Sequence, residues 1–403
     1  MVRRAGAAAL LVAALCGLGA ARGSGQSGKP GEPGEPFVWD LPPGFPAPAV
    51  PADNPMSAVK VELGRRLFYD PRLSGDGTLA CAGCHQQDRA FTDGRARARG
   101  ATGEFHPRSA MSLANTGYNT TLTWADPNLD RLEDQARIPL FNRRPVEMGA
   151  SGNEGRILAR LRQDPDYPLL FRLSFPEEGD EAIRFDTITR ALATFQRTLI
   201  SGRSPYDRML YQDDREALSP RAKQGMRLFF SETLACSQCH GGFTFSGPIA
   251  FRLQGETVAV EPAFHNTGLY NLGDGAYPEN DPGLYHHTAR PEDMGRFRAP
   301  TLRNVAVTAP YMHDGSIATL AEVIDHYAAG GRSAREGHPN PYRSPRIHGF
   351  AITEAEKAAL IEFLNSLTDE NFLTDPRFSD PWQEHGAAAA AGGGNPPLLP
   401  PSR

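Results

Sequence analysis

Two short clusters of cysteine and histidine carry the strongest chemical signal in the sequence. One reads CAGCH at 81–85 and the other reads CSQCH at 236–240. Two thiols at this spacing can form thioethers with the vinyl groups of one haem, and the histidine that follows can bind its iron. The predicted cofactor-binding residues are therefore Cys81, Cys84 and His85 for one haem c, and Cys236, Cys239 and His240 for a second.

Four cysteines also allow other chemistry. In an exported protein two disulfides are the ordinary expectation, and mixed cysteine and histidine sets can bind zinc. The histidine directly after each pair favours haem, because neither a disulfide nor a zinc site requires it at that position.

Both clusters lie in an internal repeat. GRRLFYDPRLSGDGTLACAGCH, from Gly64, resembles GMRLFFSETLACSQCH, from Gly225. Two related units are therefore expected, each with a haem that supplies much of its core. The predicted fold class is mainly α, with two c-type cytochrome-like haem domains and long loops.

Three segments have the apolar periodicity of helices. In 185–201, Asp186 is expected to cap a helix with an inward stripe of Ile188, Leu192, Phe195 and Leu199. In 353–367, TEAE predicts a capping box, and Leu360, Phe363, Leu364 and Leu367 face the core. In 319–329, Tyr327 follows Leu320, Val323 and Ile324 on the inward face.

Composition limits the remaining possibilities. The 403 residues allow two domains, and a net charge of −5 with scattered basic residues makes nucleic-acid binding improbable. The N-terminus has two arginines, a short apolar run and small residues, which predicts a secretory signal peptide and a periplasmic protein without a membrane span. Cys16 follows Leu15 rather than a small residue, so a lipid anchor is not expected.

Composition also predicts the order of segments along the chain. Residues 22–55 are rich in proline and glycine, and the end of the chain lacks apolar periodicity. The predicted organisation is a signal peptide at 1–21, a linker and strap at 22–55, an N-terminal haem domain at 56–215, a C-terminal haem domain at 216–375 and a disordered tail at 376–403.

Further motifs resemble the bacterial di-haem cytochrome c peroxidases and their relatives MauG and MbnH. They are SLANTGYNTTLTWADPNLDRLEDQARIPLFNRRPVEMG and APTLRNVAVTAPYMHDGSIATLAEV. The resemblance implies that the first haem reacts with hydrogen peroxide, with Trp124 between the haems, Gln135 in the distal pocket and Glu147 as the acid/base carboxylate. Without it, a core tryptophan, a loop amide and a solvated glutamate would be the ordinary interpretations.

The resemblance also implies a calcium ion between the domains. Thr308 and Pro310 match the positions whose backbone carbonyls bind it, and oxygen ligands suit a hard cation. Ser109 stands where the family has an asparagine ligand. A serine hydroxyl is a shorter donor, so Ser109 is the weakest member of this predicted set.

Two positions separate the subfamilies. The place of the histidine that caps the first haem in many peroxidases falls near Ala101, and nearby His106 resembles a structural residue, so an open first haem is expected. Tyr327 matches the methionine ligand of the second haem in peroxidases and the tyrosine of MauG and MbnH. His326 and Met312 are the competing ligands for that iron.

The implied activity is that of a MauG-like oxidase. It would use hydrogen peroxide to form a bis-Fe(IV) state and oxidise a tryptophan on an exported partner protein, as MbnH does to MbnP, to kynurenine. The alternatives are a cytochrome c peroxidase that draws electrons from small cytochromes, and a di-haem electron carrier without enzyme activity.

Overall fold

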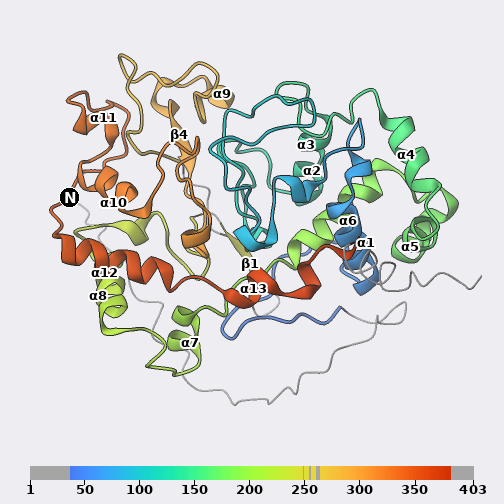
Figure 1. The fold of residues 1–403 in the computed structure, drawn as a ribbon, viewed down its shortest axis with the longest axis horizontal. Helices are drawn as coiled ribbons and strands as arrows, with labels where there is room; N and C mark the ends of the chain where they lie inside the picture. Colours follow the sequence, from blue (N-terminus) through green and yellow to red (C-terminus); the bar gives the residue numbers. More distant parts are fainter. Residues whose placement is uncertain (1–36, 248, 254–255, 260–263, 383–403) are drawn as a thin grey trace, which may run out of the picture.

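The computed structural model describes residues 37–247, 249–253, 256–259 and 264–382. Two helical lobes lie side by side (Figure 1), and strands are few and short. The prediction of a mainly α fold is confirmed. The predicted signal peptide, Cys16 and the first part of the linker lie outside the described residues.

Thirteen α-helices and four strands occur in the described part of the chain. The first lobe contains most of the earlier helices and the second contains α8 to α12, as Figure 1 shows. The helices are α1 Ala58–Tyr69, α2 Leu132–Gln135, α3 Arg137–Phe141, α4 Glu154–Arg162, α5 Tyr167–Ser174, α6 Phe185–Arg197, α7 Pro205–Tyr211, α8 Pro220–Phe229, α9 Tyr285–Thr288, α10 Leu320–Ala328, α11 Arg332–Arg335, α12 Glu354–Asn365 and α13 Glu370–Thr374.

The strands form two small antiparallel pairs. β1 (Ala250–Leu253) pairs with β2 (Glu256–Ala259), and β3 (Phe264–Asn266) pairs with β4 (Arg296–Arg298). In the second pair His265 lies opposite Phe297. This pair therefore joins two segments of the second lobe that are about thirty residues apart in sequence.

The internal repeat of the sequence is also a repeat of helix packing. α1 packs on α6 in the first lobe, and α8 packs on α12 in the second. A Cβ atom at Gly64 would lie 2.0 Å from the carbonyl oxygen of Ala191, and one at Gly225 would lie 1.9 Å from that of Ala359. Each lobe thus needs glycine at the same point, because the two helix backbones meet there.

The three predicted helices are present, with one difference at a cap. The apolar stripe of α6 is buried as expected, but the helix starts after Arg184 and Asp186 is not its N-cap. The Arg184 backbone N–H instead donates to the Thr187 hydroxyl, and Asp186 pairs with Arg190 at 3.1 Å. The capping boxes of α10 and α12 are confirmed.

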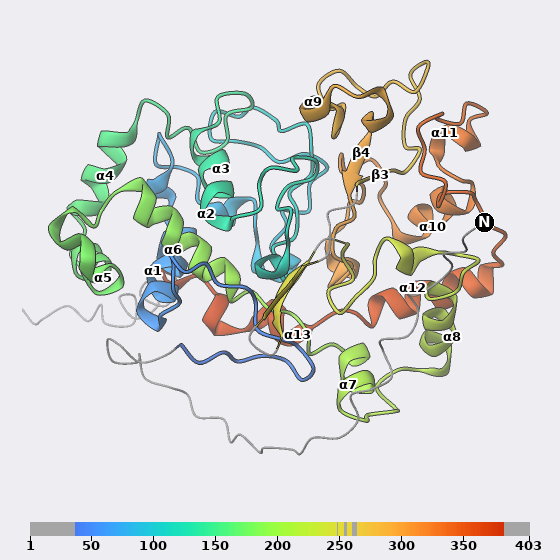
Figure 2. The same ribbon diagram turned by 180° about the vertical axis from the view of Figure 1, so that it is seen from behind.

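The end of the described chain returns to the first lobe. α13 lies between the lobes in both views (Figures 1 and 2), and Phe372 and Phe378 are buried in the first lobe's core. The Tyr69 hydroxyl donates to the Phe378 carbonyl at 2.7 Å, and the Trp382 indole donates to the Arg66 carbonyl at 3.3 Å. The prediction of disorder from residue 376 is therefore wrong for 376–382, because two aromatic side chains hold this segment.

The segment before α1 contacts both lobes. Phe45 packs against Tyr118 of the first lobe and Phe243 of the second, with ring centroids 6.4 and 4.9 Å away. The Tyr118 hydroxyl donates to the Pro46 carbonyl at 2.8 Å.

Within the described residues, no helix combines the length and the apolar character that a bilayer crossing needs.

Candidate haem sites

The CAGCH motif lies on the wall of a large cavity in the first lobe. Cys81–Gly83 form a short 3-10 turn, and the ring Nδ1 of His85 lies 2.7 Å from the backbone carbonyl of Phe91. An Nδ1–H that donates to a carbonyl fixes the ring and leaves Nε2 with its lone pair for a metal. Burial lowers the pKa of His85, which keeps the imidazole neutral.

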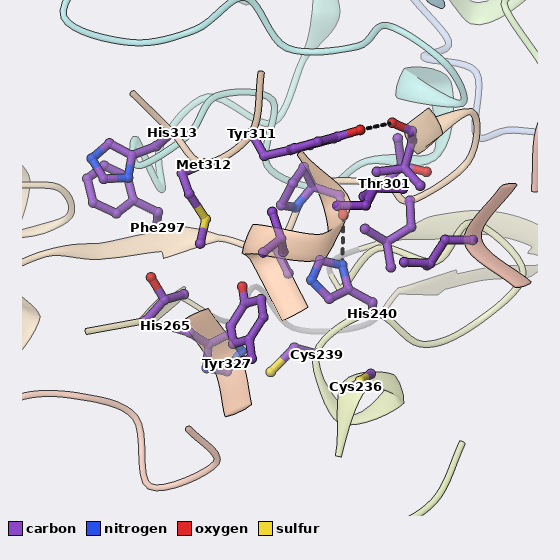
Figure 3. A pocket seen from close by; sticks show the side chains of 18 of the residues that line it. Cys236, Cys239, His240, His265, Phe297, Thr301, Tyr311, Met312, His313 and Tyr327 are labelled. Carbon is purple, nitrogen blue, oxygen red and sulfur yellow. Dashed lines mark hydrogen bonds between the residues drawn. The ribbon is translucent and has the colours of Figure 1, made fainter. Parts of the chain in front are cut away.

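The CSQCH motif has the same arrangement in the second lobe. Nδ1 of His240 lies 3.0 Å from the carbonyl of Pro300, the contact drawn as a dashed line in Figure 3. Burial lowers the pKa of His240 to about 4. Both histidines are therefore neutral and oriented by a backbone carbonyl, as a haem ligand requires.

The thiols suit covalent attachment better than the alternatives. All four described cysteines are free, and burial raises the pKa of Cys81 and of Cys236 to about 12. A zinc site needs thiolates, and no group of three or more histidine, cysteine, aspartate or glutamate side chains that could hold a metal occurs among the described residues.

The cavities have the size and lining that a porphyrin needs. They enclose about 2170 Å³ in the first lobe and about 1660 Å³ in the second, both including space open to solvent. Apolar side chains of α8, α10 and α12 line the second cavity, among them Phe229, Ile324 and Leu360. The residues present thus fit one haem c in each lobe.

The first cavity brings together the residues that the sequence placed there. Gln135 ends α2, which is anchored by the buried ion pair of Glu133 and Arg197 at 2.6 Å. Glu147 lines the same cavity as His85 and Gln135. Burial raises the pKa of Glu147 to about 7, a value at which a carboxylate can take up and release a proton near neutral pH.

Trp124 lines both cavities. Its indole N–H donates to the Ser109 carbonyl at 3.0 Å, and its own carbonyl accepts the Arg298 backbone N–H at 2.8 Å. The first contact comes from the first lobe and the second from β4. Trp124 is therefore held between the lobes by a side-chain hydrogen bond to the first lobe and a backbone hydrogen bond to the second.

Neither of two nearby residues offers the first cavity a ready ligand. The Ala101 side chain cannot bind iron, and its backbone N–H donates to the Glu147 carbonyl at 2.7 Å. His106 lines the cavity, but its Nδ1 accepts the Arg108 backbone N–H at 3.1 Å, so the neutral ring carries its proton on Nε2 and offers the cavity no free lone pair. His106 thus has the structural contact that the sequence suggested.

The second cavity has Tyr327 on the side facing His240 (Figure 3). The Tyr327 hydroxyl makes no hydrogen bond to any described residue, and burial raises the pKa of its phenol. Met312 lines the same cavity, so it stays an alternative ligand. His326 does not, because its Nε2 contacts the Thr267 carbonyl at 3.1 Å and its Nδ1 accepts the Arg332 N–H at 3.0 Å.

Comparison with known proteins also indicates a protein with two haem groups. The family model for di-haem cytochrome c peroxidases matches residues 58–215. A cytochrome-c peroxidase from Denitromonas iodatirespirans, IdrP1, is 36% identical over 361 residues, covering 85% of this chain and 91% of its own. The methylamine utilization protein MauG of Methylorubrum extorquens is 35% identical over 323 residues, covering 79% and 81%. The chain belongs to the di-haem cytochrome c peroxidase and MauG family.

A solved structure is more similar still. A crystal structure described as a MauG-like protein associated with microbial copper homeostasis has a TM-score of 0.81 and 49% identity, and covers 86% of this chain and 99% of its own. Family membership implies two haem c groups and a haem-dependent peroxidase or oxidase activity with hydrogen peroxide.

The residues predicted to bind calcium are found on the wall of the second cavity, and Ser109 also lines the first. Thr308, Pro310 and Ser109 all line the second cavity. The Thr308 and Pro310 carbonyls accept no backbone hydrogen bond from the described residues, whereas the Ser109 hydroxyl donates to the Arg95 carbonyl at 3.3 Å. Two of the three predicted ligands thus have free oxygens.

Sequence reasoning missed the carbonyls that orient the two histidines. Phe91 lies six residues after His85, but Pro300 lies sixty residues after His240. A backbone carbonyl leaves no residue signature, so only the fold could reveal which carbonyl orients each imidazole.

Proposed function

We propose that this protein is a MauG-like oxidase that uses hydrogen peroxide to oxidise a tryptophan on an exported partner protein, to kynurenine in the manner of MbnH. The observation that carries the proposal is the tyrosine, Tyr327, opposite His240 in the second cavity. A tyrosine ligand favours oxidised iron, whereas the methionine of a peroxidase favours electron uptake from a carrier.

The first cavity supplies the groups for reaction with peroxide. A bound haem would provide the iron at which the O–O bond breaks. Glu147 then accepts a proton from one peroxide oxygen and returns it to the leaving oxygen, a role that its pKa of about 7 suits. The Gln135 amide orients the peroxide beside it, because α2 is fixed by the Glu133 and Arg197 ion pair.

Trp124 provides the route between the cavities. An indole can lose and regain an electron, and Trp124 is the one tryptophan among the described residues that lines both cavities. Its fixed N–H bond to Ser109 keeps the ring in one orientation. The oxidising equivalents can therefore be shared between the lobes and drawn on by a partner at the surface, which need not enter the first cavity.

The proposed reaction balances with peroxide as the oxidant. Each peroxide takes up two electrons and two protons and gives two waters. Two peroxides therefore take four electrons and four protons from a tryptophan and give four waters; two waters supply the two oxygen atoms added in N-formylkynurenine, so two are released overall. Hydrolysis of the formyl group then gives kynurenine and formate.

A cytochrome c peroxidase is the second candidate, and its relative IdrP1 at 36% identity favours it. In that case electrons would come from small cytochromes, and Met312 could be the ligand of the second iron. A di-haem electron carrier is less favoured, because the Ala101 position offers no side chain to close the first iron.

The cellular setting belongs to the same proposal. The leader-like N-terminus supports export to the periplasm, where an MbnP-like, tryptophan-bearing partner would be met. The free Thr308 and Pro310 carbonyls support a calcium ion at the lobe interface. The solved relative's link to copper homeostasis supports a partner encoded with copper-handling proteins.

The test uses the haem-loaded protein, hydrogen peroxide and the exported protein encoded beside its gene. Mass spectrometry of the partner's peptides should show kynurenine at one tryptophan only when enzyme and peroxide are both present. Rapid peroxide turnover with reduced cytochrome c, together with an unmodified partner, would favour the peroxidase instead.

A further inference from the structure

Arg298 is a buried cation without an anion. It lies in β4, is 4% exposed and lines the second haem cavity. No carboxylate among the described residues comes within ion-pair distance of it. The contrast is Arg303, also fully buried, which is paired with Asp207 at 2.8 Å.

The hydrogen bonds of Arg298 leave part of its guanidinium unused. Nε donates to the Thr123 carbonyl at 3.3 Å, Nη1 to the Ser246 hydroxyl at 3.3 Å and Nη2 to the Met111 sulfur at 3.7 Å. A guanidinium has five N–H donors, so two remain, and the bond to a thioether is weak. None of these three acceptors carries a charge.

A buried guanidinium without a charged partner is unfavourable unless an anion pairs with it. A buried charge without a partner destabilises a folded protein, because it loses its hydration and gains no counter-charge. Burial lowers the pKa of Arg298 to about 10, so it is still a cation at neutral pH. The missing anion must therefore reach Arg298 from the cavity that it lines.

We propose that Arg298 binds a propionate carboxylate of the second haem. A haem c bound through Cys236, Cys239 and His240 occupies this cavity, and its propionates are its only charged side groups. The two free N–H groups of Arg298 match the two oxygens of a carboxylate. This inference rests on haem binding alone and does not depend on which substrate the enzyme oxidises.

Arg298 would then connect the second haem to Trp124. Its guanidinium holds the Thr123 carbonyl and its backbone N–H holds the Trp124 carbonyl at 2.8 Å. One residue of the second lobe would thus contact both the haem edge and the loop that carries Trp124. Arg298 is a positioning residue in this proposal, since it does not touch the reacting oxygen atoms.

The test measures the reduction potential of each haem against pH in the haem-loaded protein. In the natural protein the propionate is paired and ionised, so the potential of the second haem should be flat between about pH 6 and 8. In Arg298→Gln the unpaired buried propionate has a raised pKa and binds a proton on reduction, so that potential should fall as pH rises. Arg298→Lys should restore the flat profile.

The matched control is Arg296→Gln, which removes a half-exposed cation from the same strand. Arg296 pairs with Asp293 at 3.2 Å, so its loss should leave both potentials and their pH dependence unchanged. A second-haem potential in Arg298→Gln that follows the natural protein and Arg296→Gln at every pH would overturn the proposal.

A crystal structure of the haem-loaded natural protein decides the matter even when Arg298→Gln does not retain its haem. A propionate oxygen within hydrogen-bond distance of an Arg298 nitrogen supports the proposal. Both propionates turned away from Arg298, with only water or a protein carboxylate at its free N–H groups, contradicts it.

Discussion

The two haem cavities have the same contacts around the histidine of each attachment motif and differ in the residues that line the rest of the wall. His85 and His240 both direct Nδ1 at a backbone carbonyl, 2.7 and 3.0 Å away. Among the other lining residues, the first lobe presents Glu147, which we propose as the proton carrier, and the second presents Tyr327, which we propose as the iron ligand. A repeated attachment motif therefore fixes the cofactor, while segments outside the repeat decide what each cofactor can do.

The largest expected effect comes from removing the proton carrier of the first cavity. In Glu147→Gln the side chain keeps its size but loses its basic oxygen, so the rate of reaction with hydrogen peroxide should fall about 10²- to 10⁴-fold. Stopped-flow spectroscopy of the ferric protein measures this rate. Both haems should remain bound, because Glu147 is not part of either attachment motif.

Asp134→Asn is the matched control for that change. Asp134 lies beside Gln135 but is exposed, so its loss should leave the rate within about twofold. Equal rates in Glu147→Gln and Asp134→Asn would contradict the proton-carrier role and remove the main difference between the two cavities.

The same carboxylate should give the first cavity a pH dependence that the second lacks. Burial raises the pKa of Glu147 to about 7, and only its ionised form can accept the peroxide proton. The rate should therefore rise about tenfold per pH unit below 7 and level off above it. A profile that falls with rising pH, or that is unchanged in Glu147→Gln, would assign the titration to another group.

The sequence predicted the attachment side of each cavity because that chemistry is local. Cys-x-x-Cys-His needs its residues within one turn, so the motif alone places them. The remaining wall was harder: a helix face and a family resemblance predicted Tyr327 as a ligand, and nothing in the sequence pointed to Arg298. A lone arginine in a short strand has no periodicity or spacing that marks it, and its meaning depends on the absence of a carboxylate, which only the fold shows.

The segment from residue 376 onward shows the same limit. Its low periodicity predicted disorder, yet Phe378 and Trp382 each dock on the first lobe. Single aromatic anchors hold a segment that has no regular pattern, because burial of one large ring offsets the ordering of a few residues.

The reduction potential of the second haem should depend more on Tyr327, its proposed axial ligand, than on the other residues that line the second cavity. Tyr327→Met should raise the potential of the second haem by about 0.1 V or more, since axial ligands set haem potentials over a wide range. The peroxide-generated spectrum should also lose the features shared by both haems. Spectroelectrochemical titration measures the first effect and rapid-scan absorption the second.

Met312→Leu tests the competing ligand in the same cavity. It should leave the potential and the low-spin spectrum of the second haem as they are in the natural protein. A large shift in Met312→Leu with none in Tyr327→Met would move the ligand to Met312 and make the second cavity resemble that of a peroxidase.

The smallest expected effect concerns the scaffold that the two lobes share. In Gly64→Ala the new Cβ would lie 2.0 Å from the Ala191 carbonyl oxygen, so α1 and α6 must separate, and Gly225→Ala has the same effect on α8 and α12. Each should destabilise its lobe by roughly 1–3 kcal/mol in denaturant unfolding. Gly155→Ala is the control, because nothing lies within 4 Å of its added Cβ and alanine favours a helix. Equal losses for Gly64 and Gly225 would show that the lobes share one scaffold, so that their different chemistry comes from the segments added to it; a Gly64→Ala protein as stable as Gly155→Ala would contradict the close approach of α1 and α6.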